Sequence, residues 1–184
     1  MKSENVMIVP VELARIAISE NSQTQVIWLK EKNGTRSFPI LIGIFEAWAI
    51  ERHVKGKSFL RPLTHDLLAG VLTGLKAKLK HIVINDIKDG TFYARLVIEH
   101  NGEIVNIDSR PSDAIALATQ VKSPIFVEEK VLQSVAAPEG MQASPGFNPD
   151  IQKETWAFDE PEDFEDTDDE EEEEDDDEDD EEEE

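Results

Sequence analysis

The chain has 184 residues, of which 18 are Lys or Arg and 41 are Asp or Glu, and its formal net charge is −23. It contains no cysteine, which excludes disulfides, zinc sites built on cysteine and thiol catalysis. The N-terminal stretch MKSENVM does not form a signal peptide, and no apolar run approaches the roughly 18 residues of a membrane helix. We therefore expect a soluble, cytoplasmic protein.

The negative charge is concentrated at the C-terminal end. Up to Phe158 the chain contains 18 basic and 18 acidic residues and is neutral, so residues 159–184 carry all of the remaining 23 negative charges. We expect three parts: an α+β domain over 1–133, a flexible linker over 134–158 with a docking segment around Trp156, and a disordered acidic tail over 159–184. The neutral domain lacks the basic excess that nucleic-acid-binding proteins usually have.

Three strands are predicted at the start of the domain, over residues 6–18, 26–32 and 37–42. The dipeptide Asn33-Gly34 marks a hairpin between the second and the third. Pro39 has no backbone N–H to donate, so the third strand is expected at an edge of the sheet. An unprotected edge favours pairing between subunits, and on this basis we expect a homodimer.

Two helices are predicted next, over residues 42–54 and 65–79. Phe45 and Trp48 belong to the apolar stripe of the first, and Thr64 is the expected cap of the second. The apolar stripe of the second helix consists of Leu67, Leu68, Val71, Leu72 and Leu75. Because each helix is apolar along one stripe only, both are expected to cover one face of a single sheet.

The stretch 85–121 contains two turn signals, alternating strands and a helix. Asp89-Gly90 and Asn101-Gly102 are typical of tight hairpins, whose central residues need positive φ. After Ile107 the period changes from two to that of a helix, with Pro111 and Asp113 in its first turn and a serine cap. A strand over 81–87 precedes this stretch and a short strand over 124–128 follows it. The fold class is α+β, a mostly antiparallel mixed sheet with three helices packed on it.

Five segments resemble, in order, the bifunctional nuclease family, also called the BFN domain. They read FPILIGIFEAWAI at 38–50, RPLTHDLL at 61–68, DGTFYARL at 89–96, IDSRPSDAIALA at 107–118 and PIFVEEKVL at 124–132. The resemblance implies a small α+β domain with nuclease activity on DNA and RNA. It does not assign the catalytic residues, which have to be argued from residue chemistry.

Carboxylates close to helix starts are the candidate metal ligands. Phosphodiester hydrolysis is assisted by Mg²⁺ or Mn²⁺ held by carboxylates, and we assign this role to Asp108 and Asp113. Asp86 and Asp89 are further carboxylates of this stretch, but an Asp before Gly is what a hairpin turn requires. Asp113 also has a structural interpretation, because an acid in a first helical turn complements the helix dipole.

His65, Asp66 and Arg110 are the candidate catalytic residues. The imidazole of His65 can accept a proton at neutral pH, and Arg110 offers a planar fork for phosphate just before a helix N-terminus. The alternatives are a solvated first-turn residue for His65, a dipole-compensating acid for Asp66, and an ion pair of Arg110 with Asp108 or Asp113. If the catalytic interpretation holds, the three catalytic candidates and the two metal ligands should lie in one cleft: His65, Asp66, Asp108, Arg110 and Asp113.

Two functions from different classes fit the sequence. The first is a nuclease that hydrolyses phosphodiester bonds of DNA or RNA with the help of a divalent metal. The second is a non-catalytic interaction or regulatory module whose acidic tail engages a basic partner. A basic patch that phosphate or the tail would contact comprises Arg52, Lys55, Lys57 and Arg61, although most charge runs are simply solvated faces.

Overall fold

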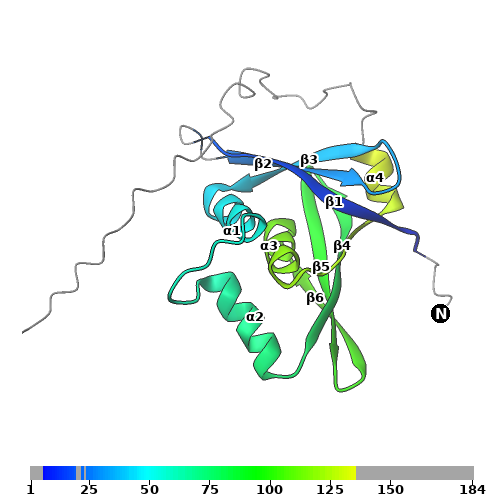
Figure 1. The fold of residues 1–184 in the computed structure, drawn as a ribbon. Coiled ribbons are helices and arrows are strands. Elements are labelled where there is room, and N and C mark those ends of the chain that lie inside the picture. The colour runs from blue at the N-terminus through cyan, green and yellow to red at the C-terminus, as the bar shows by residue number, and fades with distance from the viewer. Residues whose placement is uncertain (1–5, 20–21, 23, 136–184) are drawn as a thin grey trace, which may run out of the picture.

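The computed structural model describes residues 6–19, 22 and 24–135 (Figure 1). These residues form an α+β domain, which confirms the predicted class. The elements follow in the predicted order, with one helix more than predicted at the end. Residues 134 and 135, where the predicted linker begins, are still helical, and the rest of the linker predicted over 134–158 and the acidic tail predicted over 159–184 lie outside the described residues. None of the helices in the described part of the chain is long and apolar enough to cross a membrane.

Seven strands form one mixed sheet in the described residues. They are β1 (Ile8–Ala17), β2 (Thr24–Glu31), β3 (Ser37–Gly43), β4 (Lys78–Lys88), β5 (Thr91–His100), β6 (Glu103–Ser109) and β7 (Ile125–Glu128). Their order is β3-β2-β1-β7-β4-β5-β6, with β7 parallel to β4 and the other neighbouring pairs antiparallel. The two edges are therefore β3, which carries Pro39 as predicted, and β6.

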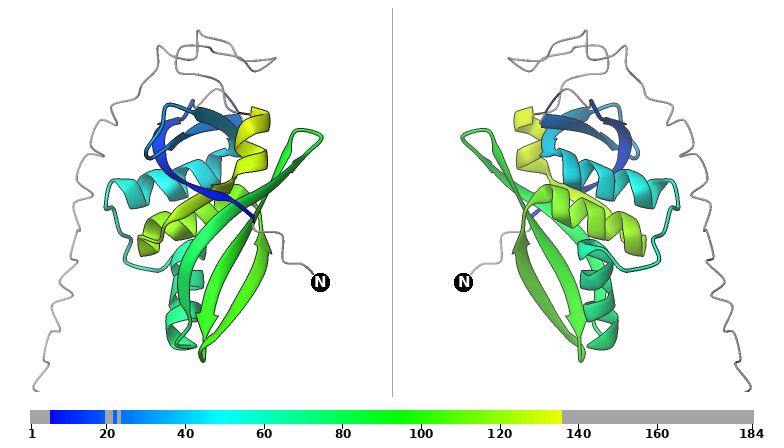
Figure 2. Two further views of the ribbon diagram at one scale, coloured as in Figure 1. Left: turned by 90° about the vertical axis from the view of Figure 1, so that its right-hand side faces the viewer. Right: turned by 90° about the vertical axis from the view of Figure 1, so that its left-hand side faces the viewer.

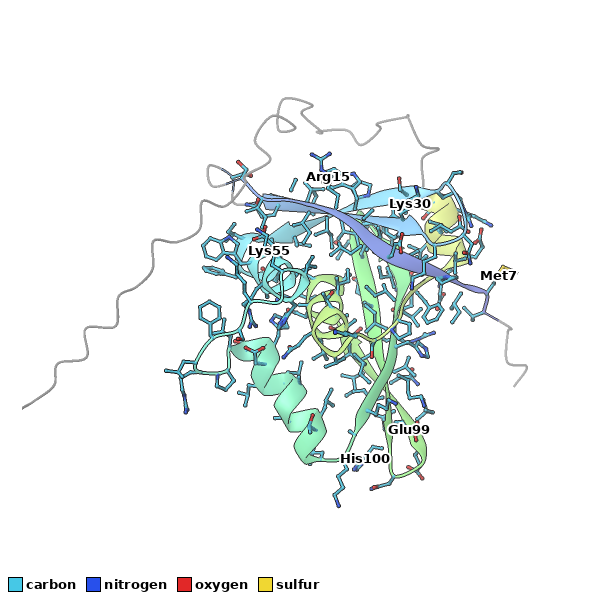
Figure 3. The ribbon with its side chains drawn as sticks, in the orientation of Figure 1. Met7, Arg15, Lys30, Lys55, Glu99 and His100 are labelled. Atoms are coloured by element: carbon cyan, nitrogen blue, oxygen red, sulfur yellow. The ribbon has the colours of Figure 1, made fainter. Side chains whose placement is uncertain are left out.

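The hairpins form where the turn dipeptides predicted them. Asp89 and Gly90 have φ of 50° and 78°, and Asn101 and Gly102 have φ of 53° and 82°. Both pairs thus occupy the left-handed region that a type I′ turn requires. In Figure 3, Glu99 and His100 lie at the tip of the β5–β6 hairpin, at the opposite end of the molecule from Arg15 and Lys30.

The sheet is strongly curled. Phe38 of β3 and Phe92 of β5 stack with their ring centroids 5.8 Å apart, although four strands separate β3 from β5 in the sheet order. The core lies on the concave side, where Ile27, Leu29 and Ile84 are fully buried. This curvature leaves room on one side of the sheet for helices.

Four helices accompany the sheet: α1 (Ile44–Val54), α2 (Thr64–Gly74), α3 (Pro111–Val121) and α4 (Glu129–Val135). Of these, α3 is the central one, with every residue from Ala114 to Ala118 buried, and α1 packs along it (Figure 2). In α4, Val131 and Leu132 join the core. This short helix was missed because its seven residues, about two turns, are too few to display a helical period.

The second helix ends earlier than predicted. Lys76 has a φ of 56°, its N–H bonds to the carbonyl of Thr73, and the N–H of Ala77 bonds to the carbonyl of Leu72. This pattern is a Schellman motif, which terminates a helix with one left-handed residue. Residues 78 and 79 consequently belong to β4 rather than to α2.

The predicted apolar stripes of α1 and α2 were wrong for most of their large residues, although Leu72 packs against the core as predicted. In α1 the buried apolar residues are Ala47 and Ile50, whereas Phe45 is exposed and Trp48 is 47% exposed. In α2 no residue is fully buried. The physical reason for α1 is that it lies against α3 over small side chains, because alanines allow two helices to approach closely, and the large residues are left facing outward.

Candidate active site

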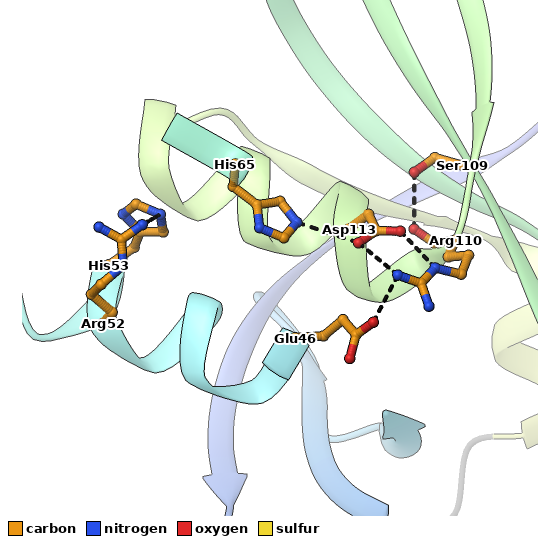
Figure 4. A network of polar contacts seen from close by, with 7 residues as sticks. All are labelled: Glu46, Arg52, His53, His65, Ser109, Arg110 and Asp113. Atoms are coloured by element: carbon orange, nitrogen blue, oxygen red, sulfur yellow. Dashed lines mark hydrogen bonds and ion pairs between the residues drawn. The ribbon is translucent and has the colours of Figure 1, made fainter. Parts of the chain in front are cut away.

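Polar side chains from four segments meet where α1, α2 and α3 come together (Figure 4). Glu46 comes from the first turn of α1, His65 from the first turn of α2, and Asp113 from the first turn of α3. Arg110 is the residue that precedes α3. We call these four residues the Arg110 cluster.

Arg110 links two carboxylates. Its Nε donates to Asp113 Oδ2 at 2.7 Å, and its Nη2 donates to Asp113 Oδ1 at 3.0 Å and to Glu46 Oε1 at 2.7 Å. His65 Nε2 lies 3.3 Å from Asp113 Oδ1 on the other side of this carboxylate. The Arg110 side chain is nevertheless 65% exposed, so a ligand can approach its guanidinium from solvent.

The local sequence explains this arrangement. Pro111 occupies the first position of α3, where its missing N–H costs no hydrogen bond, and Arg110 is held extended with ψ of 143°. The three-residue spacing then brings Asp113 under the Arg110 side chain. The predicted serine cap was wrong: no side chain caps α3, and Ser109 Oγ donates instead to the carbonyl of Arg110 at 3.0 Å.

A second group of polar side chains lies beside the first and is more buried. Arg52 Nη2 lies 3.0 Å from both carboxylate oxygens of Asp66, and Gln120 Nε2 donates to Asp66 Oδ1 at 2.8 Å. His53 Nε2 is 3.0 Å from the same nitrogen of Arg52. We call Arg52, His53, Asp66 and Gln120 the Asp66 cluster. It ties the ends of α1 and α3 to the start of α2.

Asp66 also helps to start its helix. Its Oδ2 accepts the backbone N–H of Leu63, the N-cap residue, at 2.9 Å. The predicted cap, Thr64, is instead the first helical residue, so this prediction was wrong. A carboxylate at this position can take the place of a capping side chain, because it satisfies a backbone donor that the helix leaves unpaired.

Hydrogen bonds and burial set the charge states around these residues. Burial opposes ionisation of Asp66, but the hydrogen bonds from Arg52 and Leu63 outweigh it and lower the pKa of this carboxyl. Burial and the adjacent Arg52 lower the pKa of His53. Asp113 and then Glu46 raise the pKa of Arg110. The structure therefore favours the charged form of Arg110, the ionised form of Asp66 and the neutral form of His53.

The five predicted site residues do not all meet. His65, Arg110 and Asp113 come together in the Arg110 cluster, while Asp66 turns to Arg52 and Gln120. Asp108 lies opposite Arg95 of β5, and successive strand residues point to opposite faces, so its side chain is on the other side of β6 from Ser109. The assumption of one cleft containing all five is thus wrong for Asp108.

The predicted metal ligands, Asp108 and Asp113, do not lie together. Asp113 already accepts from Arg110 and contacts His65, and Asp108 does not approach it. Among the residues that the structure describes, no group of three or more His, Asp or Glu is arranged to hold a metal ion. Asp108 and Asp113 therefore do not form a joint metal site in this arrangement, and the use of a divalent metal stays a prediction.

Sequence reasoning missed four members of these clusters: Glu46, Arg52, His53 and Gln120. Glu46 lies in the first helical turn of α1, where an acid only suggests dipole compensation, and Gln120 carries no local signal. Arg52 was assigned to a surface patch, yet its side chain is only 9% exposed and is paired with Asp66. Lys55 of the same predicted patch pairs with Glu51, one helical turn away, at 3.0 Å. The two remaining candidate carboxylates, Asp86 and Asp89, lie at the β4–β5 turn and not in either cluster, and Asp86 pairs with Lys88.

Two comparisons place the chain among known proteins. The family model described as the bifunctional nuclease domain matches residues 27–140. Two proteins described as uncharacterized, from two strains of Mycobacterium tuberculosis, are each 41% identical to the chain over 122 residues. The match covers 66% of this chain and 73% of either relative.

Proposed function

The chain belongs to the bifunctional nuclease domain family, and on this premise we propose that it hydrolyses phosphodiester bonds of DNA or RNA at the Arg110 cluster. The observation that carries the proposal is the contact between His65 and Asp113 beside the exposed guanidinium of Arg110. A titratable imidazole, a carboxylate that orients it and a phosphate-binding cation are the groups that such a hydrolysis uses.

In this proposal Arg110 binds the scissile phosphate. Asp113 and Glu46 accept from its Nε and Nη2, so the N–H groups of Nη1 are the ones left to donate to a phosphate. Arg110 stands at the N-terminus of α3, where the helix dipole also favours an anion. Glu46 and Asp113 hold the side chain in place, so little side-chain freedom is lost when the phosphate binds.

His65 acts as the general base. Its Nε2 faces Asp113, which leaves Nδ1 to take a proton from the attacking water. Asp113 holds the imidazole in one orientation and stabilises the imidazolium that forms. A general base typically accelerates a reaction by about 10²–10⁴-fold. Asp66 is a positioning residue, because its bonds to Arg52 and Gln120 fix the start of α2 next to His65.

The test is a purified-protein assay on labelled single-stranded and double-stranded DNA and RNA. Each substrate is incubated with Mg²⁺, with Mn²⁺ and with chelator, because metal assistance remains a prediction of its own. His65→Gln and Asp113→Ala should lose cleavage, and His100→Gln, a histidine of the distant hairpin, should keep it. Cleavage that persists in Asp113→Ala at the wild-type rate would identify a contaminating nuclease or a wrong site.

A second candidate function is a non-catalytic interaction module. The observation in its favour is that Arg110 already satisfies two carboxylates, as a purely structural ion-pair network would. Under this reading the acidic tail supplies contacts with a basic partner. Absence of cleavage in every arm of the assay, together with normal folding, would favour the interaction module.

A further inference from the structure

A groove of about 550 Å³ opens to solvent between the C-terminal ends of α2 and α3 and the beginning of β4. Its floor is apolar and is formed by Ala69, Leu72, Ala77, Leu79, Val121 and Pro124. None of the described residues that line it belongs to the Arg110 cluster or to the Asp66 cluster. The groove is therefore separate from the proposed active site, and what it binds does not depend on the chain being a nuclease.

Both helices end at this groove with a lysine in the left-handed conformation. Lys76 and Lys122 each have a φ of 56°, and the N–H of Ser123 bonds to the carbonyl of Ala118 at 2.8 Å. The end of α3 thus repeats the Schellman motif that ends α2. Glycine adopts this conformation without strain, whereas a residue with a side chain does not. The two helix ends therefore place cations beside the groove at some conformational cost.

Four lysines stand around the apolar floor: Lys76, Lys78, Lys80 and Lys122. All four are exposed, and the last three line the groove directly. Within the part of the chain that the structure describes, only Lys80 of the four has a carboxylate partner, Glu99 at 2.6 Å. We call the floor and these lysines the lysine groove. A ligand that fits it has an apolar group for the floor and negative charges for the rim.

Residues 154–164 of the chain have this combination. They read ETWAFDEPEDF and include three aromatic residues, five acids and no basic residue. They lie outside the residues that the structure describes. The run 168–184 that follows consists of acids alone, so it could pair with the lysines but has no side chain for the apolar floor. The aromatic and acidic segment is therefore the better fit.

The chain is long enough to bring this segment to the groove. The 20 residues 136–155 separate the end of α4 from Trp156. Twenty residues span on the order of 70 Å when fully extended, and a coil of this length has ends roughly 25 Å apart. A domain of about 130 residues has a diameter of roughly 35 Å. Tethering then gives the segment an effective concentration on the order of millimolar at the groove, so weak docking suffices.

We propose that residues 154–164 of the same chain dock in the lysine groove, with the indole of Trp156 on the apolar floor and the carboxylates of residues 159–163 paired with the lysines. A tryptophan side chain buries about 150–250 Å² of surface, and the groove is large enough to receive it. Ion pairs at a surface contribute little each, so the aromatic side chain supplies most of the docking energy and the charges select the segment.

Nucleic acid is the competing occupant. Its phosphates would also pair with the lysines, but a duplex keeps its bases stacked and has no apolar group to place on the floor. A single strand could offer a base, yet it would have to displace a segment that is tethered at millimolar effective concentration. The segment of the chain itself supplies both the apolar and the acidic half of the contact.

The experiment is NMR of the isotope-enriched full chain with a nitroxide spin label. The chain has no cysteine, so Gln152→Cys gives a single attachment point just before the segment. The amide signals of Thr73, Ala77 and Ser123 should lose more than about half of their intensity, because a site with a submillimolar Kd is mostly occupied at millimolar effective concentration. These signals should stay intact when spin-labelled, unenriched chain is mixed with enriched, unlabelled chain. A loss in the mixed sample would mean contact between copies and would overturn the proposal.

Two variants of the labelled chain test the two halves of the contact. Trp156→Ala should restore the groove signals, and Phe147→Ala, which removes an aromatic residue outside the segment, is its control. Lys78→Glu combined with Lys122→Glu should lower the docked fraction about tenfold, because attraction to the acids becomes repulsion. Lys32→Glu, at an exposed lysine of the β2–β3 hairpin, is the matched control and should leave the signals weakened.

Each result decides the proposal. Circular dichroism shows whether the lysine variant is folded, and if it unfolds, Trp156→Ala answers the question from outside the described domain. Full intensity of the groove signals in the labelled chain overturns the proposal. So does a loss of intensity that is the same in Trp156→Ala and in the lysine variant as in their controls. If the groove signals keep full intensity and shift only when a single-stranded oligonucleotide is added, nucleic acid is the occupant and the proposal is wrong.

Discussion

His65 Nε2 lies 3.3 Å from Asp113 Oδ1, and this contact joins residues that are 48 positions apart in the chain. It connects the first turn of α2 to the first turn of α3, and it places an imidazole next to the exposed guanidinium of Arg110. The proposed chemistry depends on this contact more than on any other in the molecule.

His65→Gln is expected to reduce kcat by about 10²–10⁴-fold, because glutamine can hydrogen-bond to Asp113 but cannot take up a proton. Asp113→Asn should also lower kcat, since the amide can still hydrogen-bond to the imidazole but does not stabilise its positive charge. The measurement is single-turnover cleavage of the best substrate found in the assay. His100→Gln serves as control, and equal activity in His65→Gln and in this control would remove His65 from the mechanism.

Arg110→Lys is expected to raise KM about tenfold while the charge is retained, because an ammonium has three N–H groups in place of five and cannot bond to both carboxylates and to the phosphate as well as a guanidinium does. The side chain is largely exposed, so the free energy of unfolding should change by no more than about 1 kcal/mol. Substrate titrations and urea denaturation measure the two effects. Arg15→Lys on β1 is the control. A large loss of stability with unchanged KM would mean that Arg110 has only a structural role.

Asp66→Ala is expected to destabilise the fold by about 3–5 kcal/mol, because it leaves the buried guanidinium of Arg52 without its carboxylate. Asp89→Asn, in an exposed turn, should change stability by less than about 0.5 kcal/mol. Urea denaturation of both variants gives the comparison. Replacing Arg52 by Met in the Asp66→Ala background should recover part of the loss, and no recovery would argue against an unpaired charge as the cause.

Stability is expected to fall as the pH is lowered from about 7.5 to about 5.5. Burial lowers the pKa of His53 and of His81 below the ordinary value of 6.5. At pH values near and below 6.5 these histidines take up protons in the unfolded chain but not in the folded chain, so acid favours unfolding. Their contribution to the free energy of unfolding is therefore fully present only above the ordinary pKa of 6.5. Denaturation midpoints across this range give the slope, which His53→Gln should reduce. Midpoints that rise toward the acidic end would contradict the sign.

Deletion of residues 159–184 removes 23 negative charges. If the tail competes with nucleic acid for the basic side chains of the domain, the shortened chain should bind nucleic acid more tightly at low salt. The advantage should shrink near about 0.3 M salt, where exposed charges are screened. Fluorescence anisotropy with a labelled oligonucleotide measures it. Unchanged affinity at low salt would leave the tail a role in solubility alone.

Much of the fold could be predicted because its signals are local. Asn101-Gly102 and Asp89-Gly90 specify tight turns whatever surrounds them, and Pro39 restricts β3 to an edge. The period of two in the stretch after Thr91 predicts a strand with one buried face. Helix ends were less predictable, since Lys76 terminates α2 in a left-handed conformation that lysine seldom adopts.

The candidate site was predictable only in part. His65, Asp66, Arg110 and Asp113 stand at helix starts that the sequence indicates, yet their pairing depends on how α2 packs against α3. Glu46 and Gln120 join from α1 and from the far end of α3, and no spacing along the chain links them to the others. The sequence alone could have shown that Asp108 and Ser109 point to opposite faces of the sheet, because successive side chains along a strand alternate between the two faces.

By itself the sequence determined the strand and helix periods, the hairpin turns, the edge position of β3 and the concentration of the net negative charge in residues 159–184. Only the tertiary structure decided which apolar residues are buried, and it placed Ala47 in the core while leaving Trp48 and the leucines of α2 exposed. It also decided that Arg52 is an internal partner of Asp66 and not a surface cation. The reason is physical: a period shows that a face is apolar, but burial depends on what packs against that face.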